Sequence, residues 1–449
     1  MSKQFSEVLT MKIHPKDVHK ILSKYMLIDG FDLVLDLRKS RGCRIYDARS
    51  DRYLIDCFSF FATAPLGCNH PKMTDPTFIK EIGEIALHNP SNSDVYTVEM
   101  AEFVDTFARL AMPSYFHHLF FISGGALAVE NALKTSFDWK IRKNFLKGAR
   151  DEIGKQVIHF KDAFHGRTGY TLSMTNTFDP NKTKYFTKFN WPRITNPKIT
   201  FPLNRENLER VKELERQAID EIEEAVSKNK DDIAALIIEP IQGEGGDNHF
   251  RKEFFIELRR LCDKHEMMFI VDEVQSGLGL TGKMWAHEHY DIKPDILAFG
   301  KKTQVCGIMA GSRVDEIEDN VFKVSSRLNS TWGGNLVDMV RCKKYLEIMK
   351  EEDILKNVEK QGKYLMEGLE ELQEKHSDKM MHARGKGLMC AFDLPTTAER
   401  DEFKDKLYKA GVVILGCGAT TIRFRPPLII SSDEIDEVLQ IIDKTLSSM

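Results

Sequence analysis

Residues that could do chemistry follow several apolar segments of this 449-residue chain. Asp272 comes directly after one such segment, and a carboxylate at the end of a buried strand needs a cationic or hydrogen-bonding partner. Lys301 and Lys302 follow another. In a partly dry site, desolvation and a neighbouring positive charge lower the pKa of an amine, which can then form a Schiff base with an aldehyde. The glycine turn 123–126 precedes a segment with helical periodicity, and the free N–H groups that open a helix favour an anion.

Together these features match what pyridoxal 5′-phosphate (PLP) requires. An anion cradle suits its phosphate, a carboxylate suits its ring nitrogen, and a lysine amine suits its aldehyde. Taken singly, each feature is also compatible with a purely structural role: a strand-to-helix turn, a helix-capping aspartate and a pair of solvated lysines. Two more polar segments follow apolar runs, FHGR at 164–167 and the acidic, glycine-rich EPIQGEGG at 239–246, and either can be a ligand contact or a solvated loop.

The elements that must position these residues alternate between amphipathic helices and short apolar strands, from about residue 98 to 330. Strands that are apolar on both faces indicate a mostly parallel sheet covered by helices, with ligands at the carboxyl ends of the strands. The flanking segments differ. The opening predicts a helix over 15–26 and short antiparallel strands, and the end predicts charged helices, more strands and a closing helix from Asp433, which is a smaller α+β domain. The predicted strands are 118–122, 156–160, 235–239, 267–271 and 295–299 in the central region, and 34–39, 43–48, 53–58, 388–394 and 421–428 in the flanks.

Composition excludes several classes of protein. Hydrophobic residues make up 42% and charged residues 29%, which is typical of a globular domain. The net charge of −4 predicts no attraction to nucleic acid or to an anionic membrane. The eight scattered cysteines predict reduced thiols, the opening residues lack the apolar region of a signal peptide, and no apolar stretch approaches the ~18 residues of a membrane span. We therefore expect a cytoplasmic enzyme that acts on small molecules.

Two other kinds of site fit the sequence poorly. The segment GLGLTG at 277–282 satisfies a dinucleotide-binding pattern, which would make the protein an NAD-dependent oxidoreductase. That pattern needs a helix opening there and an acid about 20 residues on, and Met284 stands where a P-loop needs Ser or Thr. The histidines at 117–118 and 287–289 lack HExxH spacing, so we expect no metal site.

Six segments together match the pattern of a known family; in chain order they are LGCNHP (66–71), SGGALAVENALK (123–134), AFHGRTGYT (163–171), IIEPIQGEGG (237–246), VDEVQSGLGLTGKMWAHEHYDIKPDI (271–296) and FGKK (299–302). They resemble the class III, fold-type I PLP aminotransferases. Within that group, the segments 299–311 and 326–341 are similar to the lysine 6-aminotransferases. The resemblance implies a large domain with a mostly parallel seven-stranded sheet over 85–340. It also implies a small α+β domain formed by 1–84 and 341–449, and a homodimer with active sites at the subunit interface.

The resemblance also assigns roles to residues. Lys301 would be the Schiff-base residue and Asp272 the partner of the ring nitrogen. Two departures from the family pattern are clear: Ala126 brings no hydroxyl to the phosphate, and TQVCG at 303–307 replaces a glycine run. The implied cofactor contacts are Gly125, Ala126, Phe164, Asp272, Gln275, Lys301 and, toward the neighbouring subunit's phosphate, Thr331; the implied substrate contacts are Arg167, Glu244, Arg423 and Asn329.

The implied reaction moves the ε-amino group of L-lysine to 2-oxoglutarate. The products would be L-glutamate and 2-aminoadipate 6-semialdehyde, which cyclises to piperideine-6-carboxylate. Arg167 would hold the distal carboxylate of either substrate, and Arg423 the carboxylate beside the oxo group. Glu244 would pair with Arg423 while lysine is bound, and Arg425 is expected to be structural. An ornithine or 4-aminobutyrate ω-aminotransferase is the alternative.

Overall fold

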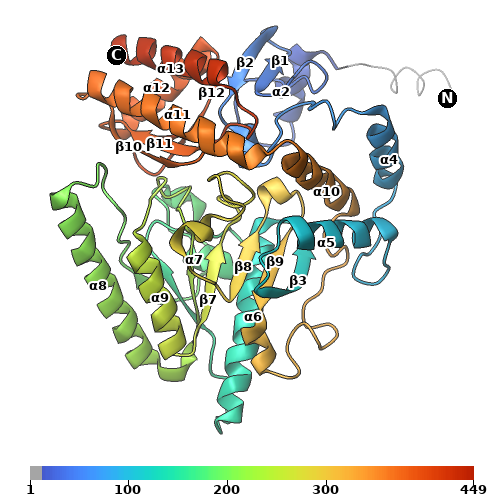
Figure 1. The fold of residues 1–449 in the computed structure, drawn as a ribbon, viewed down its shortest axis with the longest axis vertical. Helices are drawn as coiled ribbons and strands as arrows, with labels where there is room; N and C mark the ends of the chain where they lie inside the picture. The colour runs from blue at the N-terminus through green and yellow to red at the C-terminus, as the bar shows by residue number, and fades with distance from the viewer. Residues whose placement is uncertain (1–12) are drawn as a thin grey trace.

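The computed structural model describes residues 13–449, and the central part of the chain forms a seven-stranded sheet (Figure 1). The strand order is β3-β9-β8-β7-β6-β4-β5. All neighbours are parallel except β9, which runs antiparallel to both β3 and β8. This confirms the predicted mostly parallel α/β fold. The strands are β3 (Phe116–Ile122), β4 (Gln156–Phe160), β5 (Arg193–Ile194), β6 (Ile233–Ile238), β7 (Met268–Asp272), β8 (Ile296–Phe299) and β9 (Cys306–Gly311).

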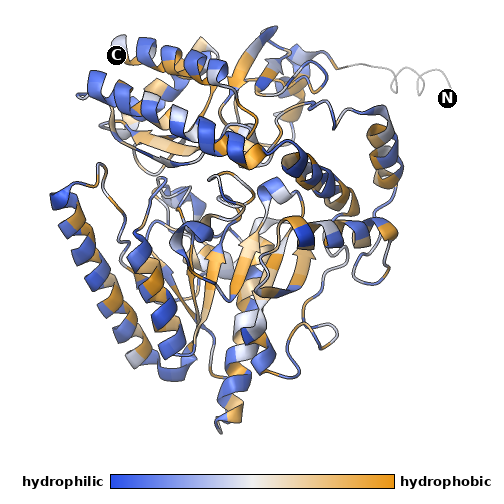
Figure 2. Ribbon diagram, viewed as in Figure 1, coloured by the Kyte–Doolittle hydropathy of each residue, from blue (hydrophilic) through white to orange (hydrophobic). Residues whose placement is uncertain are grey.

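Helices cover both faces of this sheet because its strands are apolar on both sides. In β6, Leu236 and Ile238 pack with one buried cluster, and Ala235 and Ile237 pack with another on the opposite face. Figure 2 shows that the strands are mostly hydrophobic, whereas the outer helices combine hydrophobic and hydrophilic residues. The first cluster includes side chains of α8 (Arg205–Asn229) and α9 (Lys252–Lys264), and the second includes those of α6 (Gly125–Leu146); α5 (Val98–Leu110) and α7 (Gly169–Met174) complete this part of the chain.

The two ends of the chain meet in a separate layer above the large sheet (Figure 1). Strand β2 pairs with β1 in antiparallel and with β12 in parallel orientation, so that Ile55 lies opposite Val412. A four-stranded sheet has the order β10-β11-β14-β13. The strands are β1 (Arg44–Asp47), β2 (Arg52–Asp56), β10 (Met381–Lys386), β11 (Met389–Asp393), β12 (Val412–Val413), β13 (Leu415–Cys417) and β14 (Thr421–Arg423).

Five of the longer helices in residues 13–449 accompany these smaller sheets or link them to the large one. The last of them begins one residue before the predicted start, because Ser431 and Glu434 form a reciprocal capping box. The boundaries 1–84, 85–340 and 341–449 remain our proposed division into domains, and residues 1–12 lie outside the described part of the chain. The helices are α4 (Pro76–Ala86), α10 (Leu336–Glu351), α11 (Ile354–Lys375), α12 (Thr397–Ala410) and α13 (Ser432–Ser447).

One prediction for the opening segment was correct only in part, and another was wrong. The helix expected over 15–26 begins at Pro15 but ends at Leu22; it consists of a 3-10 turn, η1 (Pro15–Asp17), and α2 (Val18–Leu22), and neither contains a buried residue. The segment 34–39 is not a strand, because the side chain of Asp36 accepts hydrogen bonds from the backbone N–H groups of Arg38 and Lys39 and closes a turn.

Five strands were not predicted: β5 and β9 in the large sheet, and β10, β12 and β13 in the smaller sheets. Strand β5 has only two residues, and β9 contains two glycines, which are poor strand formers. The segment 277–282 forms turns rather than the start of a helix, which supports rejecting the dinucleotide interpretation. No helix in residues 13–449 is long and apolar enough to cross a membrane.

Candidate active site

A cavity of about 580 Å³ lies where the chemically distinctive segments meet. It is bordered by residues that follow β3, β4, β6, β7 and β8, as expected for ligand sites in parallel sheets. The structure therefore brings most of the predicted site residues together. Those lining the cavity are Gly125, Ala126, Phe164, Arg167, Glu244, Asp272, Gln275 and Lys301.

Asp272 is the last residue of β7 and is only 5% exposed. His165 Nδ1 donates to one carboxylate oxygen at 2.7 Å, and the Val274 N–H donates to the other at 3.0 Å. Burial alone would lower the pKa of His165, but the hydrogen bond and the charge of Asp272 raise it. A cationic or hydrogen-bonding partner for Asp272 was expected from sequence, and among residues 13–449 His165 is a hydrogen-bonding partner. His165 Nε2, also buried, has no hydrogen-bond partner within residues 13–449.

The two lysines after β8 have different environments. Lys301 lines the cavity, and burial together with the charges of Arg423 and Arg425 lowers its pKa to about 8. Lys302 is buried, and its Nζ donates to the backbone carbonyl of Gln275 at 2.6 Å. Only Lys301 is therefore placed to present an amine to a ligand in this cavity.

The start of α6 forms the anion cradle that the glycine turn predicted. Gly124 has a φ of 109°, in the region that favours glycine, and α6 begins at the next residue. A Cβ at Gly125 would lie 2.7 Å from Val274 Cγ1, so a larger residue could fit here only if Val274 moved. Ala126 adds no hydroxyl, which leaves the backbone to hold an anion.

Arg423 is 1% exposed and shares a carboxylate with a residue that was not predicted. Its Nη2 donates to Glu244 at 2.7 Å, and Lys182 Nζ lies 2.5 Å from the other oxygen of Glu244. Burial alone would raise the pKa of Glu244, but these two cations lower it. Nε and Nη1 of Arg423 have no hydrogen-bond partner within residues 13–449. Arg423 itself is not among the residues that line the cavity, but its neighbour Glu244 is, and buried donors of this kind are suited to a further carboxylate.

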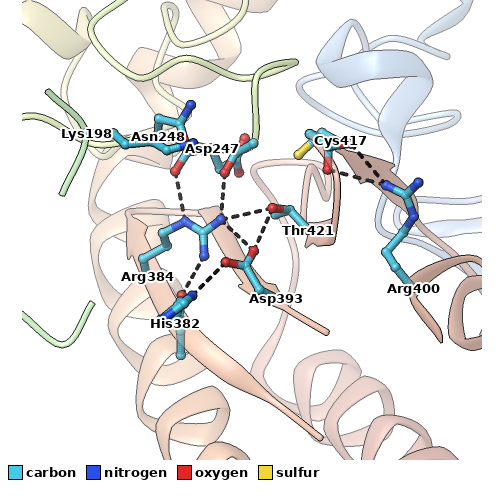
Figure 3. Close-up of polar contacts among 12 residues, drawn as sticks. Lys198, Asp247, Asn248, His382, Arg384, Asp393, Arg400, Cys417 and Thr421 are labelled. Atoms are coloured by element: carbon cyan, nitrogen blue, oxygen red, sulfur yellow. Dashed lines mark hydrogen bonds and ion pairs between the residues drawn. The ribbon is translucent and has the colours of Figure 1, made fainter. Parts of the chain in front are cut away.

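Arg425 makes contacts that fit the structural role expected from sequence. It donates to both oxygens of the fully buried Asp247, at 2.9 and 2.5 Å, and to Gln275 Oε1 at 3.0 and 2.8 Å. The Gln275 side chain is thereby held at the cavity wall. Arg384, drawn in Figure 3, donates to the carbonyls of Gly246 and Asp247 at 2.6 and 3.0 Å. The loop that carries Glu244 is thus clamped by two arginines from the C-terminal part of the chain.

Sequence reasoning missed a left-handed turn at the cavity. Four consecutive residues, Ser59–Ala62, have φ values of 39° to 63°, which non-glycine residues rarely adopt. The turn, α3, places the Phe61 ring 5.9 Å from both Lys301 Nζ and the Arg423 guanidinium carbon. Thr63 follows and lines the cavity. The amino-acid types here give no signal for this conformation.

Three other expectations concern residues away from these contacts. Asn329 and Thr331 are exposed, in the segment between β9 and α10, and do not line the cavity. Their roles, which involve a second subunit in the case of Thr331, remain predictions. His287 pairs with Glu273 through Nδ1 at 2.7 Å, and residues 13–449 contain no cluster of three potential metal ligands.

The residues of the cavity fit PLP. Three groups border one space: the Lys301 amine with its lowered pKa, the buried Asp272 carboxylate, and the start of α6 at Gly125. The hydrogen bond from His165 still leaves lone pairs of the Asp272 carboxylate free. Lys301 would hold the aldehyde carbon, Asp272 the ring nitrogen, and Gly125 and Ala126 the phosphate. Phe164 lines the same space, as expected for a residue stacked on the ring.

Comparison with known proteins identifies the family. A family model described as aminotransferase class-III matches residues 29–446. The L-lysine-epsilon aminotransferase of Mycobacterium tuberculosis (strain ATCC 25618 / H37Rv) is 51% identical over 433 residues, 96% of each chain. The enzyme of the same name from Streptomyces clavuligerus is 48% identical over 97% of this chain and 95% of its own. The solved structure of lysine aminotransferase from M. tuberculosis in the internal aldimine form is 50% identical, with a TM-score of 0.95 over 97% of this chain and 100% of the other. This chain therefore belongs to the class-III aminotransferases, and its cofactor is pyridoxal 5′-phosphate.

Proposed function

We propose that this enzyme transfers the ε-amino group of L-lysine to 2-oxoglutarate. The products are 2-aminoadipate 6-semialdehyde, which cyclises to piperideine-6-carboxylate, and L-glutamate. The similarity to two lysine ε-aminotransferases along nearly the whole chain supports this choice of donor. The observation that carries the proposal is the ion pair between Arg423 and Glu244, because it lets one cavity serve two substrates of different charge.

The two substrates place their carboxylates differently. Lysine carries its carboxylate far from the reacting carbon, whereas 2-oxoglutarate has one directly beside the reacting carbon as well. With lysine bound, Glu244 neutralises Arg423, and a buried charge without a partner would cost about 3–5 kcal/mol. With 2-oxoglutarate bound, the free Nε and Nη1 of Arg423 receive its carboxylate. Arg167, exposed at the cavity wall, holds the distal carboxylate of either substrate.

The chain's own residues then position the reaction. Bound PLP supplies an aldehyde and a ring that accepts the electron pair released at the substrate carbon. Asp272, oriented by His165, holds the proton on the ring nitrogen. Lys301 Nζ, partly neutral near pH 7 because its pKa is lowered, takes up the proton that leaves the carbon bonded to the transferred nitrogen.

The functional unit that we propose is a homodimer. Thr331 and Asn329 are exposed and lie outside the cavity lining, which supports the expectation that Thr331 reaches the cofactor phosphate of a neighbouring subunit. We further propose a cytoplasmic location, supported by the cysteines, all eight of which lie in the described residues and are free thiols.

Absorbance spectra of the pure enzyme before and after L-lysine, and then after 2-oxoglutarate, test donor and acceptor together. Lysine should bleach the cofactor band and 2-oxoglutarate should restore it. A panel that includes ornithine and 4-aminobutyrate separates the alternative donors, and a faster single turnover with either would overturn the assignment.

We call the proposed switch of Glu244, which pairs with Arg423 for lysine and leaves it for 2-oxoglutarate, the Glu244 gate, and this gate has its own test. Glu244→Ala leaves Arg423 unpaired while lysine is bound, so the lysine half-reaction should slow by at least ~100-fold, from an unpaired-charge penalty of roughly 3–5 kcal/mol. The glutamate half-reaction should change far less, because the substrate carboxylate pairs with Arg423 there. Equal losses in single-turnover assays would reject the gate.

A further inference from the structure

Glu244 is shared by two cations and borders two cavities. Arg423 holds one carboxylate oxygen and Lys182 the other, at 2.7 and 2.5 Å. Lys182 is the last residue of η2 (Pro180–Lys182), and its side chain is 15% exposed. Besides the main cavity, Glu244 lines a second one of about 320 Å³, together with Lys182, Arg400 and Cys417. The carboxylate therefore has a second cation and a second cavity beside it.

The backbone around Glu244 is fixed. The Gly418 N–H donates to the Glu244 carbonyl at 3.0 Å, and Arg384 donates to the carbonyl of Gly246 at 2.6 Å. Arg425 holds Asp247 through both of its oxygens. If Glu244 leaves Arg423, the change must therefore be a rotation of its side chain, and the second cavity offers space for that rotation.

The other cation of the second cavity is already engaged. Arg400 Nε donates to Asp401 at 2.7 Å, and its Nη1 lies 3.4 Å from the Cys417 carbonyl (Figure 3). Among the described residues, no acid other than Glu244 lies within ion-pair distance of Lys182. Lys182 is thus the cation placed to stay with Glu244 when Arg423 is taken by another carboxylate.

We propose that Lys182 is a positioning residue that retains Glu244 as an ion pair in the second cavity while Arg423 binds the oxo-acid carboxylate. This deepens the proposed function and rests on it. The effect of removing Lys182 depends on which substrate is bound. While Arg423 pairs with Glu244, the loss of Lys182 still leaves Glu244 one cation, so the ion pair loses little. Once Arg423 is occupied, Lys182 is its remaining partner, and its removal leaves a carboxylate buried and unpaired.

The test measures binding of glutarate to the PLP-loaded enzyme by calorimetry. Glutarate has the two carboxylates of 2-oxoglutarate but no carbonyl to react. Lys182→Met should raise the Kd of glutarate at least ~10-fold while leaving the single-turnover rate with L-lysine within about 3-fold, because charge-assisted contacts of this kind are worth roughly 10- to 100-fold. Lys182→Arg should restore the affinity. Lys184→Met, in the same loop and exposed, is the matched control and should change neither value.

A double-mutant cycle separates action through Glu244 from direct contact with the ligand. In a Glu244→Gln background, Lys182→Met should change the Kd of glutarate by less than about 3-fold, since no carboxylate needs the lysine. An equal loss in both backgrounds would overturn the proposal, as would unchanged glutarate affinity in the single variant. A wild-type enzyme that L-lysine does not convert would instead refute the proposed function, whatever the glutarate result.

Discussion

The lowered pKa of Lys301 makes a quantitative prediction for the enzyme stripped of cofactor. With a pKa of about 8, about 10% of the Lys301 amine is neutral at pH 7, against about 0.03% for a lysine with the ordinary pKa of 10.5, a ratio of ~300. Burial is the largest cause of the shift and the charge of Arg423 the next. Arg423→Gln removes that charge and releases Glu244, whose negative charge favours the ammonium form. Both effects raise the pKa, and each full unit lowers the neutral fraction at pH 7 ten-fold.

Competitive labelling of the cofactor-free protein with acetic anhydride between about pH 6 and 10.5 measures this amine directly. Tandem mass spectrometry distinguishes Lys301 from Lys302 in the same peptide, and exposed Lys184 serves as the internal reference. The wild-type Lys301 curve should have its midpoint near 8, and the Arg423→Gln curve a higher one. A wild-type midpoint near 10.5 would refute the account of a desolvated amine, and an unchanged midpoint in the variant would refute the contribution of Arg423.

Three further predictions follow from particular contacts. Gly125→Ala places a Cβ 2.7 Å from Val274 Cγ1, so PLP affinity in a fluorescence titration should fall about 10-fold, and adding Val274→Ala should restore it; unaltered affinity in the single variant would contradict the cradle. Arg425→Met leaves the buried Asp247 without its cation, and the free energy of unfolding in urea should drop by about 3–5 kcal/mol, whereas a loss below about 1 kcal/mol would show that the clamp is dispensable. Asp272→Asn cannot stabilise a protonated ring nitrogen, so kcat should fall at least ~100-fold with the cofactor still visible by absorbance, and retention of more than a tenth of the activity would count against the assigned role.

The sequence was sufficient to predict the centre of the fold and the chemistry at the strand ends. Runs such as 267–271 have a single interpretation as strands buried on both faces, because they are short, apolar and followed by polar turns. An acid or a lysine after such a strand then falls at the ligand-binding edge of the sheet. This argument locates Asp272 and Lys301 from the sequence alone, and the structure places both at one cavity.

Contacts between distant segments could not be predicted in the same way. Lys182 lies in a polar loop and pairs with an acid 62 positions away. Periodicity carries no signal for such a pair, and a lysine in a loop is ordinarily solvated. The left-handed turn at 59–62 was missed for a different reason: its residues disfavour that conformation locally, so surrounding contacts must impose it. One such contact is the hydrogen bond from Ser59 Oγ to the Arg425 carbonyl at 2.6 Å.

Arg423 and Arg425 show why one of two buried arginines is available to a ligand. They are two residues apart at the end of β14, and both reach the loop that carries Glu244 and Asp247. Arg425 is matched by Asp247, which is fully buried, so a competing carboxylate would leave Asp247 without a partner. Glu244 is 22% exposed, borders two cavities and has a second cation, while Arg423 keeps two unused donors. In the proposed reaction, the surroundings of each carboxylate, rather than the arginines themselves, would therefore decide which guanidinium the oxo acid binds.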